Sequence, residues 1–257
     1  MEKNAITLDR VTKRFPVYEE HLNFENRSLP RVRDGFFYAL DNVSLEIKSG
    51  IFAIVAGANG SGKSLLMSII AGLEDPGYGT VSVNGRTGLV FQEPDAQILG
   101  ETPREDTAFG PVNMGLSKTE IKARVDTALK ETGLADKADF PARSLSGGEK
   151  RRLAAAGVLA MNADIIIFDE PYANMDFPGV VQVNRLFQKL KADKKTVIIL
   201  THELEKCLSL ADQFIVLFGG KKVYDGTAEG ALLLNIEEWG IHHPLRKNES
   251  ALGDLLW

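Results

Sequence analysis

The sequence predicts an α/β fold built on a mostly parallel sheet with helices on both faces. Three observations favour this fold class. A glycine-rich loop, Gly57–Ser64, stands between an apolar strand and a helix. A second segment, Ile165–Phe168, is apolar at every position, as expected of a strand that is buried on both faces. From there to Phe218, strand-like and helix-like segments alternate, which is typical of parallel strands joined by crossover helices.

The N-terminal part is expected to form half-buried strands. Apolar and polar residues alternate in three segments: Ala5–Leu8, Val43–Ile47 and Thr80–Val83. The polar and aromatic stretch of residues 15–39 has no clear period, and a long hairpin or loop is expected there. The apolar strand Ile51–Val55 then leads into the glycine-rich loop, and a helix is expected over Ser64–Gly72.

Residues 92–145 change character and are expected to form a helical insert between two halves of the core. Proline and glycine punctuate this stretch, and a helix is expected over Ser117–Thr132, where Ser117 and Glu120 resemble a capping box. Beyond Gly226 the tail is less regular. Between insert and tail the core resumes with a helix and three strands: Ser146–Met161, Ile165–Phe168, Val197–Leu200 and Phe214–Phe218.

Composition limits what the chain can do by itself. Its 257 residues suit one domain, or a core with an added lobe. A net charge of −5 offers no basic field for nucleic acid. The single cysteine, Cys207, excludes an internal disulfide and fits a reducing compartment. The longest apolar runs are too short to span a bilayer, so any membrane role is expected to come through a partner.

The glycine-rich loop fits the pattern G-x-x-x-x-G-K-[ST], which cradles nucleotide phosphates. Its glycines let the backbone wrap closely around an anion, and the following helix presents its N-terminus to that anion. Lys63 can reach the β- and γ-phosphates, while the Ser64 hydroxyl can hold Mg²⁺. We therefore expect a nucleoside triphosphate to bind the eight loop residues: Gly57, Ala58, Asn59, Gly60, Ser61, Gly62, Lys63 and Ser64.

Two carboxylates, Asp169 and Glu170, follow the apolar strand. The carboxyl ends of parallel strands open at the ligand crevice of such a sheet. Asp169 is therefore expected to hold Mg²⁺, directly or through water, and Glu170 to polarise the water that attacks the terminal phosphate. Taken alone this segment would fit a solvated acidic turn, and it is the phosphate loop that favours a catalytic role.

A second loop, Leu145–Glu149, has paired glycines and starts a helix at once. Backbone donors at a helix N-terminus form a second phosphate site. One nucleotide needs only one such loop, so this one is expected to serve a nucleotide that another copy of the protein holds. The basic run that follows, Lys150–Arg152, is expected to be a solvated face that supports the helix.

These motifs resemble those of the ATP-binding cassette (ABC) ATPases over nearly the whole chain. Beside the phosphate loop, four matches carry the likeness: a Q-loop glutamine (Gln92), a signature sequence (Leu145–Arg152), a D-loop (Ala173–Asp176) and a switch histidine (His202). The resemblance implies a P-loop NTPase core with a mostly parallel sheet, an N-terminal antiparallel β subdomain and a helical insert. The expected parts of this single ABC ATPase domain are the antiparallel subdomain with the first part of the core (1–91), the helical subdomain (92–145), the rest of the core (146–225) and a C-terminal tail (226–257).

The resemblance also implies a role for each residue in the hydrolysis of ATP. Ser64, Gln92 and Asp169 would arrange Mg²⁺ and its waters. Glu170 would act on the attacking water, while His202 and Lys63 would contact the γ-phosphate. A facing cassette would complete the site with the residues that in this chain are Ser146, Gly147, Gly148, Glu149 and Asp176.

The family's adenine-stacking aromatic residue is expected at Phe15, because the local sequence Val11–Phe15 matches the family there. Packing in the core is the alternative for this side chain. An insertion follows Phe15, and four other aromatic residues compete for the stacking role: Tyr18, Phe36, Phe37 and Tyr38.

Within the family, the helical insert resembles that of the ATPases of energy-coupling-factor importers, which take up vitamins, cobalt or nickel. Two runs carry this likeness, Phe91–Gln97 and Asp106–Leu116. It implies a peripheral protein on the cytoplasmic face of the membrane that binds no nucleic acid. The implied partners are a second cassette, in a homo- or heterodimer, a transmembrane coupling subunit and a substrate-binding membrane subunit. The coupling subunit is expected to dock near Gln92–Gly115, where Asp106→Lys would be expected to uncouple transport.

Three alternatives stay open. The chain would also fit a cassette of another ABC importer or exporter, a soluble ABC ATPase acting on ribosomes or DNA, or a degenerate nucleotide-binding module. The acidic charge and the single cassette count against the ribosome or DNA ATPase. The intact Lys63, Asp169, Glu170 and His202 count against a degenerate module.

Overall fold

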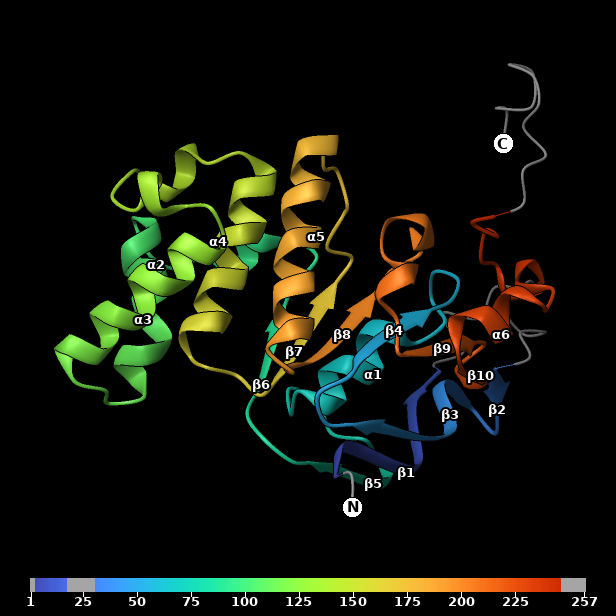
Figure 1. The fold of residues 1–257 in the computed structure, drawn as a ribbon. Coiled ribbons are helices and arrows are strands. Elements are labelled where there is room, and N and C mark those ends of the chain that lie inside the picture. The colour runs from blue at the N-terminus through green and yellow to red at the C-terminus, as the bar shows by residue number, and fades with distance from the viewer. Residues whose placement is uncertain (1–2, 18–30, 246–257) are drawn as a thin grey trace.

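The computed structural model describes residues 3–17 and 31–245. Their elements form two sheets and a helical lobe (Figure 1). In Figure 1 the lobe, made of α2 (Pro103–Asn113), α3 (Lys118–Glu131) and α4 (Gly147–Ala160), lies at the left beside β6 (Thr87–Val90), and the first sheet lies at the lower right. The phosphate loop is part of the core, at the start of α1 (Lys63–Ile70).

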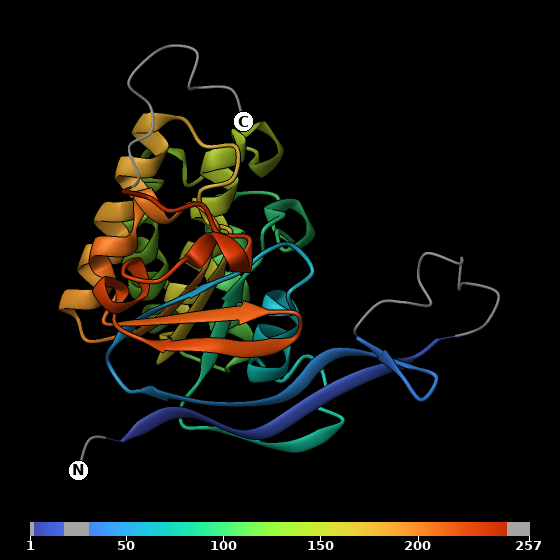
Figure 2. The same ribbon diagram turned by 90° about the vertical axis from the view of Figure 1, so that its right-hand side faces the viewer.

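The first sheet is antiparallel, with the strand order β2-β3-β1-β5. Its strands are β1 (Asn4–Pro16), β2 (Val32–Arg33), β3 (Phe36–Lys48) and β5 (Tyr78–Val83). The pair β1 and β3 contains several register shifts and is longer than the alternation predicted. Each shift reverses which side chains face inward, so the regular alternation ends in the sequence although the strands continue. Figure 2 shows this pair extending away from the body of the molecule.

The described part of the stretch of residues 15–39 contains a short hairpin between β2 and β3. The long hairpin or loop expected there falls mostly on residues 18–30, which lie outside the described residues. Asp34 and Gly35 join β2 to β3 in a turn, and both have positive φ. Glycine accepts this conformation without strain, and aspartate is among the few other residues that tolerate it. Separately, β3 pairs with β1, which places Phe15 at the end of β1 opposite Phe37 near the start of β3.

The second sheet has the strand order β10-β9-β4-β8-β7-β6 and is parallel except for β10, which runs antiparallel to β9. The strands of this sheet are β4 (Phe52–Ala56), β6 (Thr87–Val90), β7 (Ile165–Asp169), β8 (Thr196–Leu200), β9 (Gln213–Phe218) and β10 (Lys221–Gly226). The sequence patterns did not predict β6 and β10. In β6, Gly88 interrupts the apolar run at a point where a Cβ would lie 2.2 Å from the Val158 side chain, and β10 lies at the sheet edge.

Helices cover both faces of the second sheet, as expected, but on one face the antiparallel sheet lies beside the helix. On one face Phe168 and its neighbours pack against Phe187 of α5 (Phe177–Ala192), with α4 and α6 (Ala228–Leu232) alongside. On the other face Ile167 and its neighbours pack against α1 (Lys63–Ile70) and the antiparallel sheet. A sheet with one apolar face must bury that face, and here it does so against the parallel sheet.

The helical lobe has a small core of its own. Its helices are α2 (Pro103–Asn113), α3 (Lys118–Glu131) and α4 (Gly147–Ala160). Leu129 of α3 and Leu153 of α4 are fully buried in this cluster. Ser117 caps α3 by accepting a hydrogen bond from the Glu120 N–H at 3.3 Å. None of the helices in the described ranges is long and apolar enough to cross a membrane.

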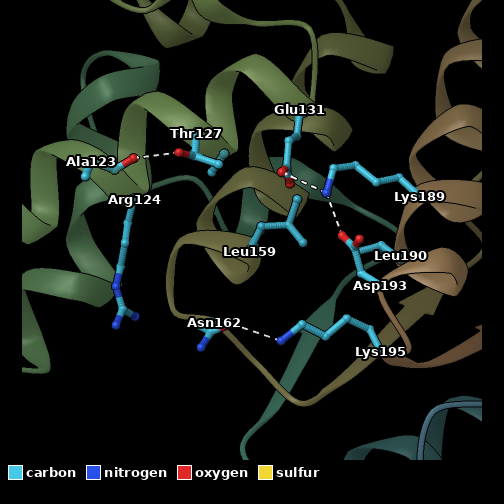
Figure 3. A pocket seen from close by; sticks show the side chains of 11 residues that line it. Ala123, Arg124, Thr127, Glu131, Leu159, Asn162, Lys189, Leu190, Asp193 and Lys195 are labelled. Atoms are coloured by element: carbon cyan, nitrogen blue, oxygen red, sulfur yellow. Dashed lines mark hydrogen bonds and ion pairs between the residues drawn. The ribbon is translucent and has the colours of Figure 1, made fainter.

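A cavity of about 370 Å³, lined by both charged and apolar side chains, lies between the lobe and the core where α3, the end of α4 and α5 meet (Figure 3). Lys189 of α5 crosses it, with Nζ 3.0 Å from Glu131 Oε1 on α3 and bound also to Asp193. Lys195 Nζ donates to Asn162 Oδ1 at 3.0 Å. These contacts tie the lobe to the core. Among the described residues that line this cavity, none is a predicted nucleotide-binding residue.

Candidate nucleotide-binding site

The phosphate loop follows β4 and can adopt its path only with glycine at two positions. Gly57 has φ +145°, and a Cβ there would lie 2.0 Å from the carbonyl oxygen of Leu217 in β9. Gly62 precedes α1 with φ +103°, and its Cβ would lie 2.9 Å from the Ala39 oxygen. Both glycines therefore let the loop sit directly on neighbouring backbone.

Lys63, the first residue of α1, is held inside the loop. Only 8% of the residue is exposed, and its Nζ donates to the carbonyl oxygens of Gly57 at 2.6 Å and Ala58 at 3.1 Å. Burial lowers the pKa of Lys63, while the charges of Glu170 and Asp169 act in the opposite direction. The loop thus fixes a cation opposite two carboxylates.

The loop forms one wall of a cavity of about 460 Å³, a volume typical of small-molecule sites. Predicted residues from four separate segments meet there: Asn59–Ser64, Gln92, Asp169–Glu170 and His202. Sequence reasoning missed Arg31 as a member of the cavity. It lies within the stretch of residues 15–39, which has no clear period, and no motif marks it.

Glu170 lies in a strained and enclosed position beside the cavity. Its φ of +46° is unusual for a residue with a side chain, and its N–H donates to the Leu200 oxygen at 2.9 Å. One carboxylate oxygen, Oε1, lies 2.9 Å from His202 Nδ1. The other, Oε2, is buried and has no hydrogen-bond partner among the residues described. A buried carboxylate oxygen without a partner is costly, so it is suited to accept a hydrogen bond from a group in the cavity.

The neighbouring residues present a donor set that fits Mg²⁺. Ser64, Gln92 and Asp169 line the same cavity and offer a hydroxyl, an amide and a carboxylate oxygen. Mg²⁺ prefers oxygen ligands and usually takes only one or two from protein, with waters and phosphate oxygens completing its shell. Burial raises the pKa of Asp169, and a hydrogen bond from Ser64 opposes that rise.

The second predicted phosphate loop lies apart from this cavity. The N-terminus of α4 is formed by Ser146, Gly147, Gly148 and Glu149. None of these four residues is among the described residues that line the cavity. Ser146 and Glu149 make a full capping box, and Glu149 is also paired with Lys137. Asp176 likewise stands at a helix N-terminus, where it caps α5 by accepting from the Gly179 N–H at 2.9 Å.

The predicted stacking residue, Phe15, is exposed on β1 and does not line the cavity in the part of the chain that is described. Phe37, its partner on β3, does line the cavity. Phe36 instead lies under the guanidinium of Arg14. Tyr18, another candidate, lies outside the described residues. The geometry therefore favours Phe37 among the aromatic candidates.

The basic run after the signature loop is not a solvated face. Arg151 and Arg152 are half-buried, and burial lowers the pKa of both. Arg151 donates to the carbonyl oxygens of Ala173 and, at 3.1 Å, of Gln92. It thus connects α4 to both the Q-loop and the D-loop. Helix periodicity could not show this, because both acceptors are backbone atoms distant in sequence.

Comparison with known proteins agrees with this geometry. The profile of the ABC transporter family matches residues 40–173. EcfA1, an energy-coupling factor transporter ATP-binding protein of Clostridium novyi, is 41% identical over 204 residues, which cover 74% of this chain and 72% of the relative. The structure of cbiO1 from Clostridium perfringens, described as part of the ABC transporter complex cbiONQ, has a TM-score of 0.75 and 30% identity, covering 90% of this chain and 92% of that one.

A dimeric, post-hydrolysis structure of the ATP-binding cassette MJ0796, bound to ADP and phosphate, has a TM-score of 0.74 and 28% identity. It covers 87% of this chain, which in turn covers 98% of that cassette. The predicted fold class is confirmed by these likenesses. The family profile spans more than half of the residues of this chain. The chain therefore belongs to the ABC transporter family and is one of the ATP-hydrolysing cassettes of that family.

Proposed function

We propose that this chain is the ATPase subunit of an importer of the energy-coupling-factor type, and that it hydrolyses Mg²⁺-ATP at an interface between two cassettes. One observation carries the hydrolytic role. Glu170 and His202 form a pair 2.9 Å apart that shares a cavity with Lys63 of the phosphate loop. The names of the relatives, which belong to energy-coupling-factor and cbiONQ complexes, support the type of importer.

The phosphates of ATP would lie along Gly57–Ser64. The loop's N–H groups and the Lys63 ammonium neutralise their charge, while Phe37 offers a face to the adenine. Ser64, Gln92 and Asp169 would hold Mg²⁺. When bound, this ion spreads the charge that develops on the β- and γ-phosphate oxygens.

Glu170 would orient the attacking water through its unpaired oxygen. The pair with His202 fixes the carboxylate through Nδ1, and the imidazole, which is otherwise exposed, would approach the γ-phosphate with its other nitrogen. Phosphoryl transfer asks little covalent chemistry of the protein, so this positioning supplies most of the effect. A positioned base of this kind contributes a factor on the order of 10² to 10⁴ in rate.

The second half of each site would come from another cassette. Ser146–Gly148 lie away from this chain's own cavity, which supports a role for them in capping a nucleotide held by a partner. The partner is a second copy or a related cassette. A dimeric relative supports this arrangement. Hydrolysis would then require two cassettes, although binding at Lys63 requires only one.

The membrane partners would dock on the helical lobe from the cytoplasmic side. Leu99, Phe109 and Val112 expose apolar side chains within the predicted docking stretch. Asp106 is unsuited to test this surface, because it is buried and accepts hydrogen bonds from the N–H groups of Leu99 at 2.7 Å and Gly100 at 3.0 Å. A charge at an exposed position such as Val112 tests it instead. The transported vitamin or metal ion would be chosen by membrane subunits.

Replacing Glu170 by glutamine tests the catalytic assignment. Glu170→Gln should keep ATP affinity within about twofold and reduce phosphate release by about 10² or more, because only the proton acceptor is lost. ATP should also drive the variant into a stable dimer, measured by light scattering. Glu205→Gln, an exposed carboxylate outside the cavity, is the matched control. Full hydrolytic activity in Glu170→Gln would overturn the assignment.

A further inference from the structure

The side chain of Arg31 reaches from the end of the insertion into the nucleotide cavity. Three of its N–H groups are held by backbone carbonyls. Nε donates to Tyr38 at 2.9 Å, Nη1 donates to Gly60 at 2.7 Å, and Nη2 donates to Ala39. Since Gly60 belongs to the phosphate loop and the other two acceptors to β3, one guanidinium joins the loop to the hairpin.

Arg31 is also stacked on an aromatic ring. Its guanidinium carbon lies 4.6 Å from the centre of the Phe37 ring. A Cβ on Gly220, in the turn between β9 and β10, would lie 3.0 Å from Nη2, so the group is enclosed from that side as well. These contacts leave the guanidinium one orientation and thus pre-position its charge at the cavity wall.

The charge of Arg31 is only weakly balanced by the described residues around it. Asp41 is the carboxylate that acts on it, but Asp41 is itself bound to Arg33 at 3.0 Å and to Lys221 at 3.4 Å. Burial lowers the pKa of Arg31. A guanidinium has five N–H donors, of which the backbone carbonyls take three. Within residues 3–17 and 31–245, two donors without a hydrogen bond and a partly desolvated positive charge therefore remain at the cavity wall.

We propose that Arg31 is a second phosphate-binding cation of this nucleotide site, acting beside Lys63. A guanidinium fixed in the fork geometry binds phosphate oxygens strongly, because its charge-assisted hydrogen bonds need little further ordering. The ligand class is a nucleoside di- or triphosphate. The proposal rests on nucleotide binding by this chain and does not depend on the type of importer or on its partners.

Affinities for ATP, ADP and adenosine separate this role from others. Arg31→Ala should weaken ATP binding about tenfold, the loss expected for one charge-assisted hydrogen bond to a charged group. ADP should also bind more weakly, whereas adenosine should bind the variant and the parent equally. The slope of affinity against salt should also become shallower in the variant, since one cation less faces the phosphates. Calorimetry on the full chain measures all of these quantities.

Matched variants keep the outcome clear. Arg33→Ala removes a neighbouring arginine that stacks on Tyr38 and pairs with Asp41 outside the cavity, and it should leave ATP affinity within about twofold. If Arg31→Ala fails to fold, Arg31→Lys and Arg31→Gln replace it. The lysine, which keeps the charge, should bind ATP more tightly than the glutamine.

Three results would overturn the proposal. The first is an ATP affinity of Arg31→Ala within twofold of the parent chain. The second is an equal loss for adenosine and ATP, which would show that Arg31 acts on the base through Phe37. The third is equal ATP affinity of the lysine and glutamine variants. A parent chain that bound no ATP at all would instead sink the nucleotide site itself, and Lys63→Ala provides that comparison.

Discussion

Two glycines of the phosphate loop allow the cost of a steric clash to be measured separately from the cost of an unfavourable backbone conformation. Gly57 and Gly60 both have positive φ, at +145° and +73°. A Cβ on Gly57 would lie 2.0 Å from the backbone oxygen of Leu217 and 2.9 Å from Ser61 Oγ, whereas a Cβ on Gly60 would meet nothing within 4 Å. Gly57→Ala and Gly60→Ala therefore form a matched pair within one loop.

The expected magnitudes follow from these contacts. Gly60→Ala should cost about 1 to 2 kcal/mol, because the new residue must hold a left-handed backbone conformation. Gly57→Ala adds a clash with a backbone atom of β9 that lies about 1 Å inside the closest distance that real Cβ atoms show. Overpacking of this kind adds about 1 to 3 kcal/mol, so the total should be about 2 to 5 kcal/mol. The clash also displaces the Gly57 carbonyl that anchors Lys63, so ATP affinity should fall further in this variant.

Urea unfolding and calorimetric ATP titration measure both effects. The midpoint should fall more for Gly57→Ala than for Gly60→Ala, with the slope against urea unchanged in each. Equal losses of stability in the two variants would refute the reasoning, because they would show that the contact with Leu217 imposes no constraint. ATP binding that survived unchanged in Gly57→Ala would refute the link to Lys63.

Two further predictions concern the core and the signature helix. Phe187 is fully buried, and the ring centres of Phe52, Phe168 and Tyr172 lie within 6.0 Å of its own. Phe187→Ala should therefore lower the free energy of unfolding by about 3 to 5 kcal/mol, whereas Phe177→Ala, at an exposed position, should change it by no more than about 0.5 kcal/mol. Equal stability of the two variants in urea unfolding would contradict this packing. The Lys137 ion pair and the Ser146 N–H hold the pKa of Glu149 below its ordinary value of 4.5, so this group stabilises the fold above that value and loses its contribution as the pH falls through the lowered pKa. Glu149→Gln should therefore melt at a lower temperature than the parent at neutral pH, and the difference should shrink in acid; a difference independent of pH would count against the pairing.

Local patterns in the sequence were enough to predict much of the fold and most of the cavity. Three parts of the site directly follow an apolar strand in the sequence, which is the local pattern that predicted them: the phosphate loop, the carboxylates after β7 and the histidine after β8. Parallel pairing of β7 with β8 then brings Glu170 and His202 together, as the position of both at carboxyl ends of strands implies. The capping box at Ser146 and Glu149 is equally local, because its two hydrogen bonds join residues three apart.

The features that escaped prediction depend on contacts between distant segments. Phe15 and Phe37 face each other only because β1 and β3 pair in a particular register, and that register contains shifts that the sequence does not mark. Arg31 is held at the cavity by hydrogen bonds to backbone oxygens. Because every residue has a backbone oxygen, the sequence does not show which residues will accept such bonds. Asp106 was misjudged for the same reason, since its role is to accept from two N–H groups.

The contacts of Arg151 show how the two halves of the nucleotide site are joined within one chain. Its helix, α4, begins with the signature residues, which lie away from this chain's own cavity. Its guanidinium donates to the carbonyls of Gln92, at the cavity, and of Ala173, three residues before Asp176, which caps α5. A displacement of α4 must therefore either break these hydrogen bonds or move the Q-loop and D-loop with it. Because charge-assisted hydrogen bonds from a half-buried guanidinium are costly to break, the segments are expected to move together. A phosphate bound at Ser146 by a partner's nucleotide would thus be felt at Gln92, which is what a shared site needs if two cassettes are to hydrolyse ATP together.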